Sequence, residues 1–165
     1  MSKIYILIVE DEPEVLDVIV KDLKHFESFF PIETANSVAE ARKGVENITK
    51  KGDMVGLFVC DHIMPNENGV DFLVEMQKVE TTKRSKKILL TGQAGLEATI
   101  KAINEAELNN YISKPWKKDE LLSIVKNNLT DFVIGNTKDD LMKYMSILDA
   151  AKIAETLRSN IAQND

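Results

Sequence analysis

The chain has 165 residues, 44% of them hydrophobic, which is enough to bury the core of one globular domain with a segment left over. Its 21 Lys and Arg stand against 27 Asp and Glu, and the net charge of -6 argues against binding to nucleic acid or to an anionic membrane surface. The single cysteine excludes an internal disulfide, and no apolar run has the length of a membrane span or of a secretion signal. We therefore expect a soluble, cytoplasmic protein.

Continuous apolar runs predict strands buried on both faces at residues 4–9, 54–60 and 87–90, and 30–35 and 109–113 are weaker strand candidates. The segments between them have the periodicity of helices with one apolar face. The five apolar sets are Val15, Leu16, Ile19, Leu23 and Phe26; Val38, Ala41, Val45 and Ile48; Phe72, Leu73, Met76 and Val79; Leu96, Ile100 and Ile103; and Leu121, Leu122, Val125 and Leu129.

Strict alternation of five strands with five helices predicts an α/β fold with a doubly wound, five-stranded parallel sheet, because right-handed crossovers place the helices on both faces. The expected strand order is 2-1-3-4-5. In such sheets ligands bind beyond the carboxyl ends of the strands, where the winding direction switches. Here that position lies between the first and third strands.

The pattern changes after about residue 132, where "GNTKDD" interrupts it and residues 141–165 predict an extra C-terminal helix. We divide the chain into a domain of residues 1–132 and a helical extension of residues 133–165. The apolar seam of that helix is Leu141, Tyr144, Leu148, Ala151, Ala154, Leu157 and Ile161, with an uneven step at the alanines. The extension can pack back on its domain, form a dimer contact or connect to an output domain.

Acidic residues follow two strands that meet at the predicted switch point. The first strand ends in Glu10 and Asp11, and the third ends in Asp61. Three carboxylates in one crevice repel one another unless a cation is bound, and oxygen ligands with room for water suit Mg²⁺ better than Zn²⁺. Taken alone, Asp61 is as readily a cap or a solvated turn residue.

Thr91 and Lys114 follow the fourth and fifth strands and add a hydroxyl and an ammonium at the same edge, so an anion is expected beside the metal. Carboxylate, divalent cation, ammonium and hydroxyl are the groups needed for phosphoryl transfer onto an aspartate. Asp61 would be the nucleophile. Its carboxylate is ionised at neutral pH, so the transfer needs no general base.

Four segments in this order resemble the signature blocks of bacterial two-component response-regulator receiver domains, which are CheY-like and have a flavodoxin-like fold. They are "ILIVEDEPEVLD", "VCDHIMPNENGVDFL", "LLTG" and "YISKPW", spread over residues 3 to about 130. The resemblance implies that Asp61 accepts a phosphoryl group from a histidine kinase or phosphotransfer protein, and that Lys114 pairs with the phosphoryl oxygens. It also implies a Mg²⁺ site made by Glu10, Asp11, Asp61 and the main-chain carbonyl of Ile63. Many family members carry Asp where this chain has Glu10, which puts the geometry of ligation in question.

Thr91 and Tyr111 resemble the switch pair of that family, although each is also an ordinary strand residue. The resemblance implies that the Thr91 hydroxyl moves to the phosphoryl group and that the Tyr111 ring turns inward. The face formed by the fourth helix, fifth strand and fifth helix would then control a partner, a homodimer or an output domain. Ile63 favours slow loss of the phosphoryl group and Gln93 favours faster loss, and the sequence does not decide between them.

Several residues are assigned no chemistry. Cys60 is interpreted as core packing, His62 as a surface or half-buried loop residue, and "KRSKK" at residues 83–87 as a solvated connector.

Two other functions were weighed. An aspartyl-phosphate hydrolase of similar fold would carry a second Asp two residues after the nucleophile, where this chain has Ile63. A nucleotide- or flavin-binding domain would carry a glycine-rich phosphate loop after the first strand, and "VEDEPE" stands there instead. The favoured interpretation is a signalling switch that catalyses only its own phosphorylation and dephosphorylation.

Overall fold

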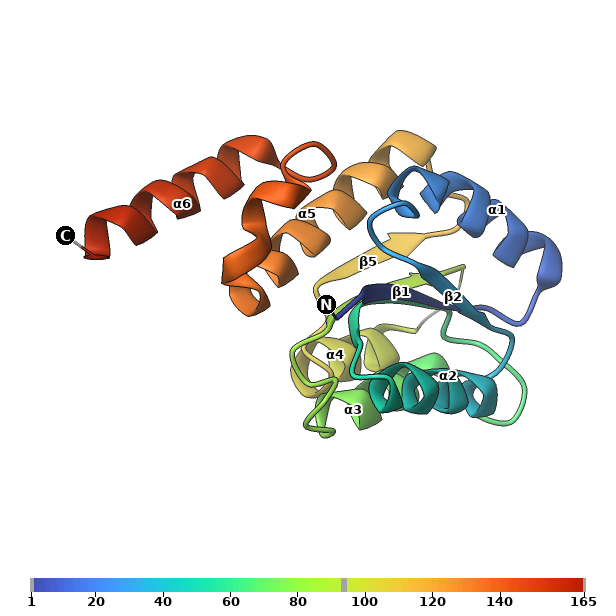
Figure 1. Cartoon of the computed structure of the whole chain (residues 1–165). Helices are drawn as coiled ribbons and strands as arrows, with labels where there is room; N and C mark the ends of the chain where they lie inside the picture. Colours follow the sequence, from blue (N-terminus) through green and yellow to red (C-terminus); the bar gives the residue numbers. More distant parts are fainter. Residues whose placement is uncertain (1, 93–94, 165) are drawn as a thin grey trace.

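A parallel five-stranded sheet in the order β2-β1-β3-β4-β5 forms the centre of this computed structural model (Figure 1), which confirms the predicted fold and strand order. The structure describes residues 2–92 and 95–164. The strands are β1 (Ile4–Val9), β2 (Ile32–Ala35), β3 (Met54–Cys60), β4 (Lys86–Thr91) and β5 (Asn110–Ser113). The α-helices are α1 (Pro13–Leu23), α2 (Val38–Lys50), α3 (Gly69–Gln77), α4 (Leu96–Glu105), α5 (Lys118–Asn136) and α6 (Ala150–Asn164), with 3-10 helices η1 (Lys24–Phe26) and η2 (Lys138–Tyr144).

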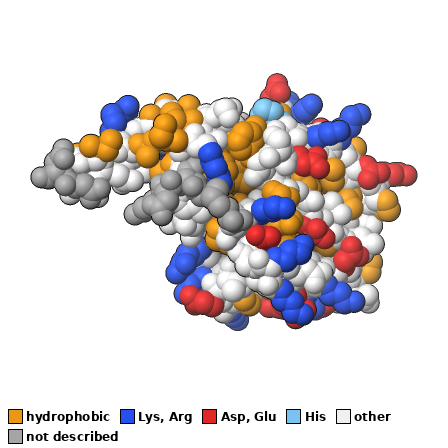
Figure 2. Space-filling model, viewed as in Figure 1, with side chains coloured by type: hydrophobic (Ala, Val, Ile, Leu, Met, Phe, Trp, Pro, Cys, Tyr) orange, Lys and Arg blue, Asp and Glu red, His pale blue; other side chains and the backbone are white. Residues whose placement is uncertain are grey.

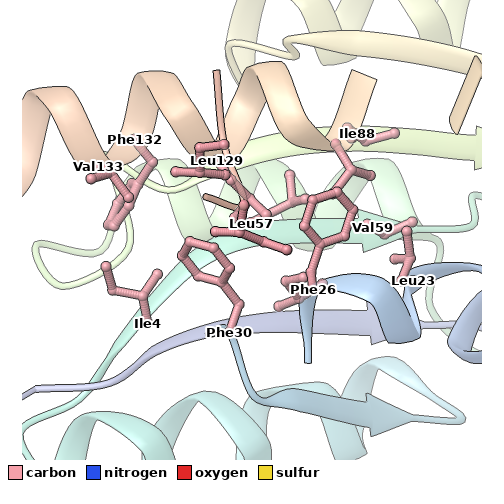
Figure 3. Packing of buried hydrophobic residues seen from close by; sticks show 14 of the residues in the cluster. Ile4, Leu23, Phe26, Phe30, Leu57, Val59, Ile88, Leu129, Phe132 and Val133 are labelled. Carbon is pink, nitrogen blue, oxygen red and sulfur yellow. The ribbon is translucent and has the colours of Figure 1, made fainter. Parts of the chain in front are cut away.

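The sheet is covered on both faces, by α1 and α5 on one side and by α2, α3 and α4 on the other (Figure 1). Successive residues of a strand point to opposite faces. In β1, Ile4, Ile6 and Ile8 therefore join the core under α1 and α5, while Tyr5, Leu7 and Val9 join the core under the other helices. Figure 3 shows the first of these cores, in which Phe30 and Phe132 lie among side chains of β1, β3 and α5. Burial on both faces explains why the sequences of β1 and β3 are continuously apolar.

The helices α1, α2 and α3 begin at residues that suit a helix N-terminus. Pro13 occupies the first turn of α1, where its missing N–H costs no hydrogen bond. The Ser37 hydroxyl accepts a hydrogen bond from the Glu40 N–H at 3.1 Å, and the Asn68 side chain accepts one from the Asp71 N–H at 2.8 Å. These caps fix where the chain leaves the loops that precede α2 and α3.

The apolar face predicted for α4 does not enter the core. Leu96, Ile100 and Ile103 are 78%, 48% and 53% exposed, and the helix is buried through Ala102 instead. Ala102 joins the buried cluster under α2, α3 and α4, and α4 packs mainly beside α3, so its larger apolar residues stay at the surface. The expectation that they face the core was wrong.

The C-terminal segment is not the single helix predicted for residues 141–165. α5 continues to Asn136, the chain then forms η2, and α6 begins only at Ala150. Tyr144 stacks on Phe30 with 5.2 Å between ring centroids, and its burial with Leu148 and Ile153 extends the core under α1 and α5. These contacts require a turn between η2 and α6, which divides the predicted seam.

Beyond its first turns α6 extends away from the rest of the molecule (Figure 1), and Ile161 is 65% exposed. On the face seen in Figure 2, hydrophobic side chains remain visible along α6, while charged side chains of both signs are interspersed over the rest. None of the helices in the described part of the chain is long and apolar enough to cross a membrane.

Candidate functional site

Strand register brings the predicted site residues to one edge of the sheet. Val9 of β1 is paired with Cys60 of β3, so Glu10 and Asp61 each follow at the same level. On the other side, Thr91 of β4 is paired with Ser113 of β5, which places Lys114 directly beyond that pair. Residues at, or directly after, the carboxyl ends of four parallel strands therefore meet at the edge where a ligand site is expected.

Lys114 joins the two buried carboxylates of this edge. Its Nζ donates to Glu10 Oε1 at 2.5 Å and to Asp61 Oδ2 at 3.3 Å. Glu10 and Asp61 are 1% and 5% exposed, so these contacts lie in a medium of low effective dielectric constant. Backbone N–H groups add to them, from Glu12 to Glu10 at 3.2 Å and from His62 to Asp61 Oδ1 at 2.8 Å.

The crowding of charge alters two proton affinities. Burial raises the pKa of Glu10 above its ordinary value, and the charge of Asp61 adds to the rise, although hydrogen bonds from Lys114 and the Glu12 N–H oppose it. Burial lowers the pKa of Lys114, but the hydrogen bond to Glu10 and the negative charges of Asp61 and Glu10 outweigh burial and raise it. Lys114 is therefore an ammonium at neutral pH, and it faces more carboxylates than it can neutralise.

The excess of carboxylate fits a divalent cation. Glu10, Asp11 and Asp61 each offer an oxygen within 4.8 Å of the others. Asp11 Oδ1 is buried, and among the described residues it has no hydrogen-bond partner. A buried carboxylate oxygen without a partner is costly unless a cation is bound. Oxygen ligands of this kind suit Mg²⁺.

A pocket of about 230 Å³ opens beside Asp61 and Lys114. It is lined by Glu12, Asp61, Ile63, Thr91, Gly92 and Lys114. The predicted nucleophile, ammonium and hydroxyl therefore share one cavity, and the Ile63 side chain, 57% exposed, stands at its rim. Glu12 and Gly92 were not predicted, because a loop residue's direction is not encoded in strand periodicity.

Gly69 allows the loop after β3 to close on the site. A Cβ atom at this position would lie 1.7 Å from the Asp61 carbonyl oxygen and 2.9 Å from Cys60 Sγ. The Gly69 N–H donates to the His62 carbonyl at 2.8 Å, which holds the first turn of α3 against the end of β3. The sequence gives a signal for it, since Asn68 and Gly69 form an Asn-Gly pair just before an apolar helix.

Thr91 and Tyr111 lie on neighbouring strands in the positions that the register predicts. Tyr111 pairs with Leu89, two residues before Thr91, so both side chains are on the same face of the sheet. Thr91 is 1% exposed and Tyr111 is 38% exposed, with the ring at the surface. Gln93 lies outside the described residues.

The neighbours of Asp61 have the places expected for them. Cys60 is fully buried. Burial is the main cause that raises the pKa of its thiol, and the negative charges of Asp61 and Glu10 add to the rise. His62 is half-buried, and desolvation lowers its pKa even though Asp61 and Asp71 oppose the shift. The peptide bond between Lys114 and Pro115 is cis.

Comparison with known proteins agrees with this geometry. The chain is 31% identical over 121 residues to the hydrogenase transcriptional regulatory protein HoxA of Bradyrhizobium diazoefficiens, covering 73% of this chain and 23% of that protein. It is 29% identical over 126 residues to the response regulator SaeR of Staphylococcus aureus, covering 76% of this chain and 50% of SaeR. The chain therefore spans half or less of the length of these relatives.

Solved structures of receiver domains have the same fold. A CheY-like response regulator receiver domain protein from Methanospirillum hungatei is 30% identical with a TM-score of 0.68, over 80% of this chain and 97% of that one. The signal receiver domain of an HD domain-containing protein from Pseudomonas fluorescens is 25% identical with a TM-score of 0.68, over 80% and 98%. Residues 6–126 match the family model of the response regulator receiver domain. The chain belongs to the response regulator receiver domain family.

Proposed function

We propose that Asp61 is the phosphoryl acceptor of a signalling switch and that a histidine kinase or phosphotransfer protein is the donor. The observation that carries this proposal is the position of Asp61 in a small pocket, with Oδ2 3.3 Å from the ammonium of Lys114. A carboxylate oxygen of Asp61 forms the bond to phosphorus while the bond from phosphorus to the donor's imidazole nitrogen breaks. The imidazole leaves with the electron pair of that bond.

The other residues of the pocket assist this transfer. Lys114 neutralises charge on the phosphoryl oxygens, and the Thr91 hydroxyl donates a hydrogen bond to one of them. Glu10, Asp11, Asp61 and the main-chain carbonyl of Ile63 would hold Mg²⁺. When bound, this ion supplies positive charge that offsets the repulsion between the acceptor carboxylate and the incoming phosphoryl group.

The output of the switch is the face formed by α4, β5 and α5. Tyr111 lies on β5 and is 38% exposed, and three large apolar side chains of α4 are also exposed. An inward turn of the ring as Thr91 engages the phosphoryl group would change the shape of the face. Its apolar residues suit a partner protein or a second copy of this chain.

Residues 133–165 form an extension whose role is separate from the phosphorylation site. We divide the chain into a receiver domain, residues 1–132, and residues 133–165, whose α6 leaves the core after its first turns. The start of this extension packs on the receiver core, and we propose that the rest of α6 packs back on the domain, forms a dimer contact or connects to an output domain. We place the protein in the cytoplasm, where a kinase can reach it, and assign it no enzymatic activity on other molecules.

The test is phosphorylation by acetyl phosphate in the presence of Mg²⁺, followed by intact mass spectrometry. The unaltered protein gains one phosphoryl group, and Asp61→Asn gains none. Asp17→Asn, an exposed aspartate on α1, is the matched control and keeps the gain. An equal gain by Asp61→Asn would rule out Asp61 as the acceptor.

A further inference from the structure

A second polar pocket, of about 330 Å³, lies at the opposite edge of the sheet, where the strands begin. The ends of α3 and α5, the start of β4 and the loop before β5 surround it. Its lining residues are Gln77, Lys83, Arg84, Ser85, Lys86, Lys87, Glu107, Asn109, Asp131, Gly135 and Asn136. All five residues of "KRSKK" line this pocket, so the segment is not the solvated connector that its sequence suggested.

Lys87 is the buried part of the pocket wall. It is 1% exposed, and its Nζ donates to Gln77 Oε1 at 2.6 Å and to the Ser85 carbonyl at 3.0 Å. The main chain of Lys87 is also fixed, since its N–H donates to Asn109 Oδ1 at 2.7 Å and its carbonyl accepts from the Asn109 N–H at 2.9 Å. The ammonium is thus held in one place before any ligand arrives.

The charge of Lys87 has no direct counter-charge. Within residues 2–92 and 95–164, no carboxylate forms an ion pair with it, and its two acceptors are neutral. Glu107 acts only at a distance, through the Gln77 amide that donates to its Oε2 at 3.0 Å. Burial lowers the pKa of Lys87 to about 8 despite the opposing charge of Glu107. A buried cation is normally paired, so this pocket is electrostatically incomplete.

The remaining charges leave the pocket positive. Asp131 is already paired with Lys152 of α6, whereas Glu107 accepts a hydrogen bond from the neutral Gln77 amide and keeps one negative charge in the pocket. Lys83 is paired with Glu80, but Arg84 and Lys86 form no ion pair among the residues that the structure describes. Both belong to the same short segment as Lys87, at the mouth of the pocket. Three cations therefore converge there on one space, in a protein whose net charge is -6.

We propose that this pocket binds the phosphate group of a small phosphorylated molecule, with Lys87 as the buried anchor and Arg84 and Lys86 as the outer ligands. Arg is suited to two parallel hydrogen bonds with phosphate oxygens, and Lys supplies a point charge. The volume exceeds that of a phosphate ion and is at the lower end of small-ligand pockets, which favours a phosphate ester with a compact organic group. The site is separate from the Asp61 pocket and does not depend on the phosphorylation proposed there.

The experiment titrates inorganic phosphate and ribose 5-phosphate into ¹⁵N-labelled protein without Mg²⁺ and with a chelator, at constant ionic strength set with chloride. Amide signals of residues 85–87 and 109 shift and saturate with each ligand. Lys87→Met and the double variant Arg84→Ala/Lys86→Ala each bind about 10-fold more weakly or worse, the loss expected when charge-assisted hydrogen bonds are removed. The double variant changes only exposed or half-buried side chains, so it retains the fold.

The matched control is Lys50→Ala/Lys51→Ala, which removes two exposed lysines at the end of α2 and leaves both affinities unchanged. Shifts that fail to saturate, that centre on residues 10, 61 and 114, or that persist at equal affinity in the double variant overturn the site. If the site binds inorganic phosphate but binds ribose 5-phosphate about 10-fold less tightly, the assignment to a phosphate ester is wrong.

Discussion

The two edges of the sheet bury groups of opposite charge, and the edges differ in whether a group of the other sign pairs with them. At the carboxyl edge, the buried carboxylates of Glu10 and Asp61 share the ammonium of Lys114, which comes from another strand end. At the amino edge, the acceptors that the described part of the chain offers to the buried Lys87 ammonium are the Gln77 amide oxygen and the Ser85 carbonyl. One edge has too few cations for its acids, whereas at the other no carboxylate of the described residues pairs directly with the buried cation, although Glu107 and Asp131 line its pocket. We propose that a ligand of opposite charge completes each site, a divalent cation at the carboxyl edge and a phosphate group at the amino edge.

The two edges also differ in how much room the backbone leaves. Gly69→Ala would place Cβ 1.7 Å from the Asp61 carbonyl oxygen, which must force the loop away from β3. We expect the free energy of unfolding to fall by about 3 kcal/mol, the upper part of the usual range for overpacking, measured by urea unfolding.

Gly135→Ala is the matched change at the amino edge, since a Cβ atom there meets nothing within 4 Å. It lies in α5, where replacing glycine by alanine should raise the free energy of unfolding by up to about 1 kcal/mol. Equal destabilisation by the two substitutions would contradict the close packing assigned to Gly69.

The pH dependence of stability should distinguish Lys87, which has no direct ion-pair partner among the described residues, from Lys114, which is paired with carboxylates. The pKa of Lys87 is lowered from 10.5 in an unfolded chain to about 8 in the fold. Between these values the folded chain has released a proton that the unfolded chain still holds, so raising the pH favours folding. Relative to Lys87→Met, the free energy of unfolding of the unaltered protein should rise by up to about 3 kcal/mol between pH 8 and 10.5.

Urea unfolding at several pH values, in buffers free of phosphate, measures that difference. The comparison with Lys87→Met removes the titration of all other groups. If the two proteins follow parallel curves, Lys87 is not a desolvated ammonium below pH 8 and the contrast between the edges fails.

Mg²⁺ should act on the carboxyl edge alone. The folded pocket assembles three carboxylates that the unfolded chain separates, so a concentration of Mg²⁺ ten times its dissociation constant should stabilise the fold by about 1.4 kcal/mol. Asp11→Asn should lose most of this gain, whereas Lys87→Met should keep it. Thermal unfolding is measured in a buffer with Mg²⁺ and in a buffer of equal ionic strength that contains no divalent cations. An equal gain in stability for Asp11→Asn would exclude Asp11 as a ligand.

The carboxyl edge was accessible from sequence because chain topology determines it. Five alternating strands and helices favour the doubly wound order 2-1-3-4-5, and that order places residues after β1, β3, β4 and β5 at one edge of the sheet. Glu10, Asp11, Asp61 and Lys114 could therefore be grouped before any coordinates existed. The role of Gly69 was missed because periodicity does not report how closely two segments of backbone approach.

The amino edge and the extension were less accessible because side-chain packing determines them. In the sequence, Lys87 is one of several lysines in a basic segment. Its fixed position becomes evident only from its hydrogen bonds to Gln77 and Asn109 in the folded chain. The outward face of α4 depends on the burial of Ala102 in the core under α2, α3 and α4, and the break before α6 accompanies the stacking of Tyr144 on Phe30. Each of these contacts joins residues far apart in the chain, where local patterns carry no information.

We propose that Asp61, and no other carboxylate, receives the phosphoryl group. Borohydride reduces an acyl phosphate to an alcohol and leaves free carboxylates unchanged, so it marks the acceptor as homoserine. After acetyl phosphate and Mg²⁺ treatment, reduction and peptide sequencing by mass spectrometry should find homoserine at position 61. Homoserine at another aspartate, with position 61 still aspartate, would contradict the account.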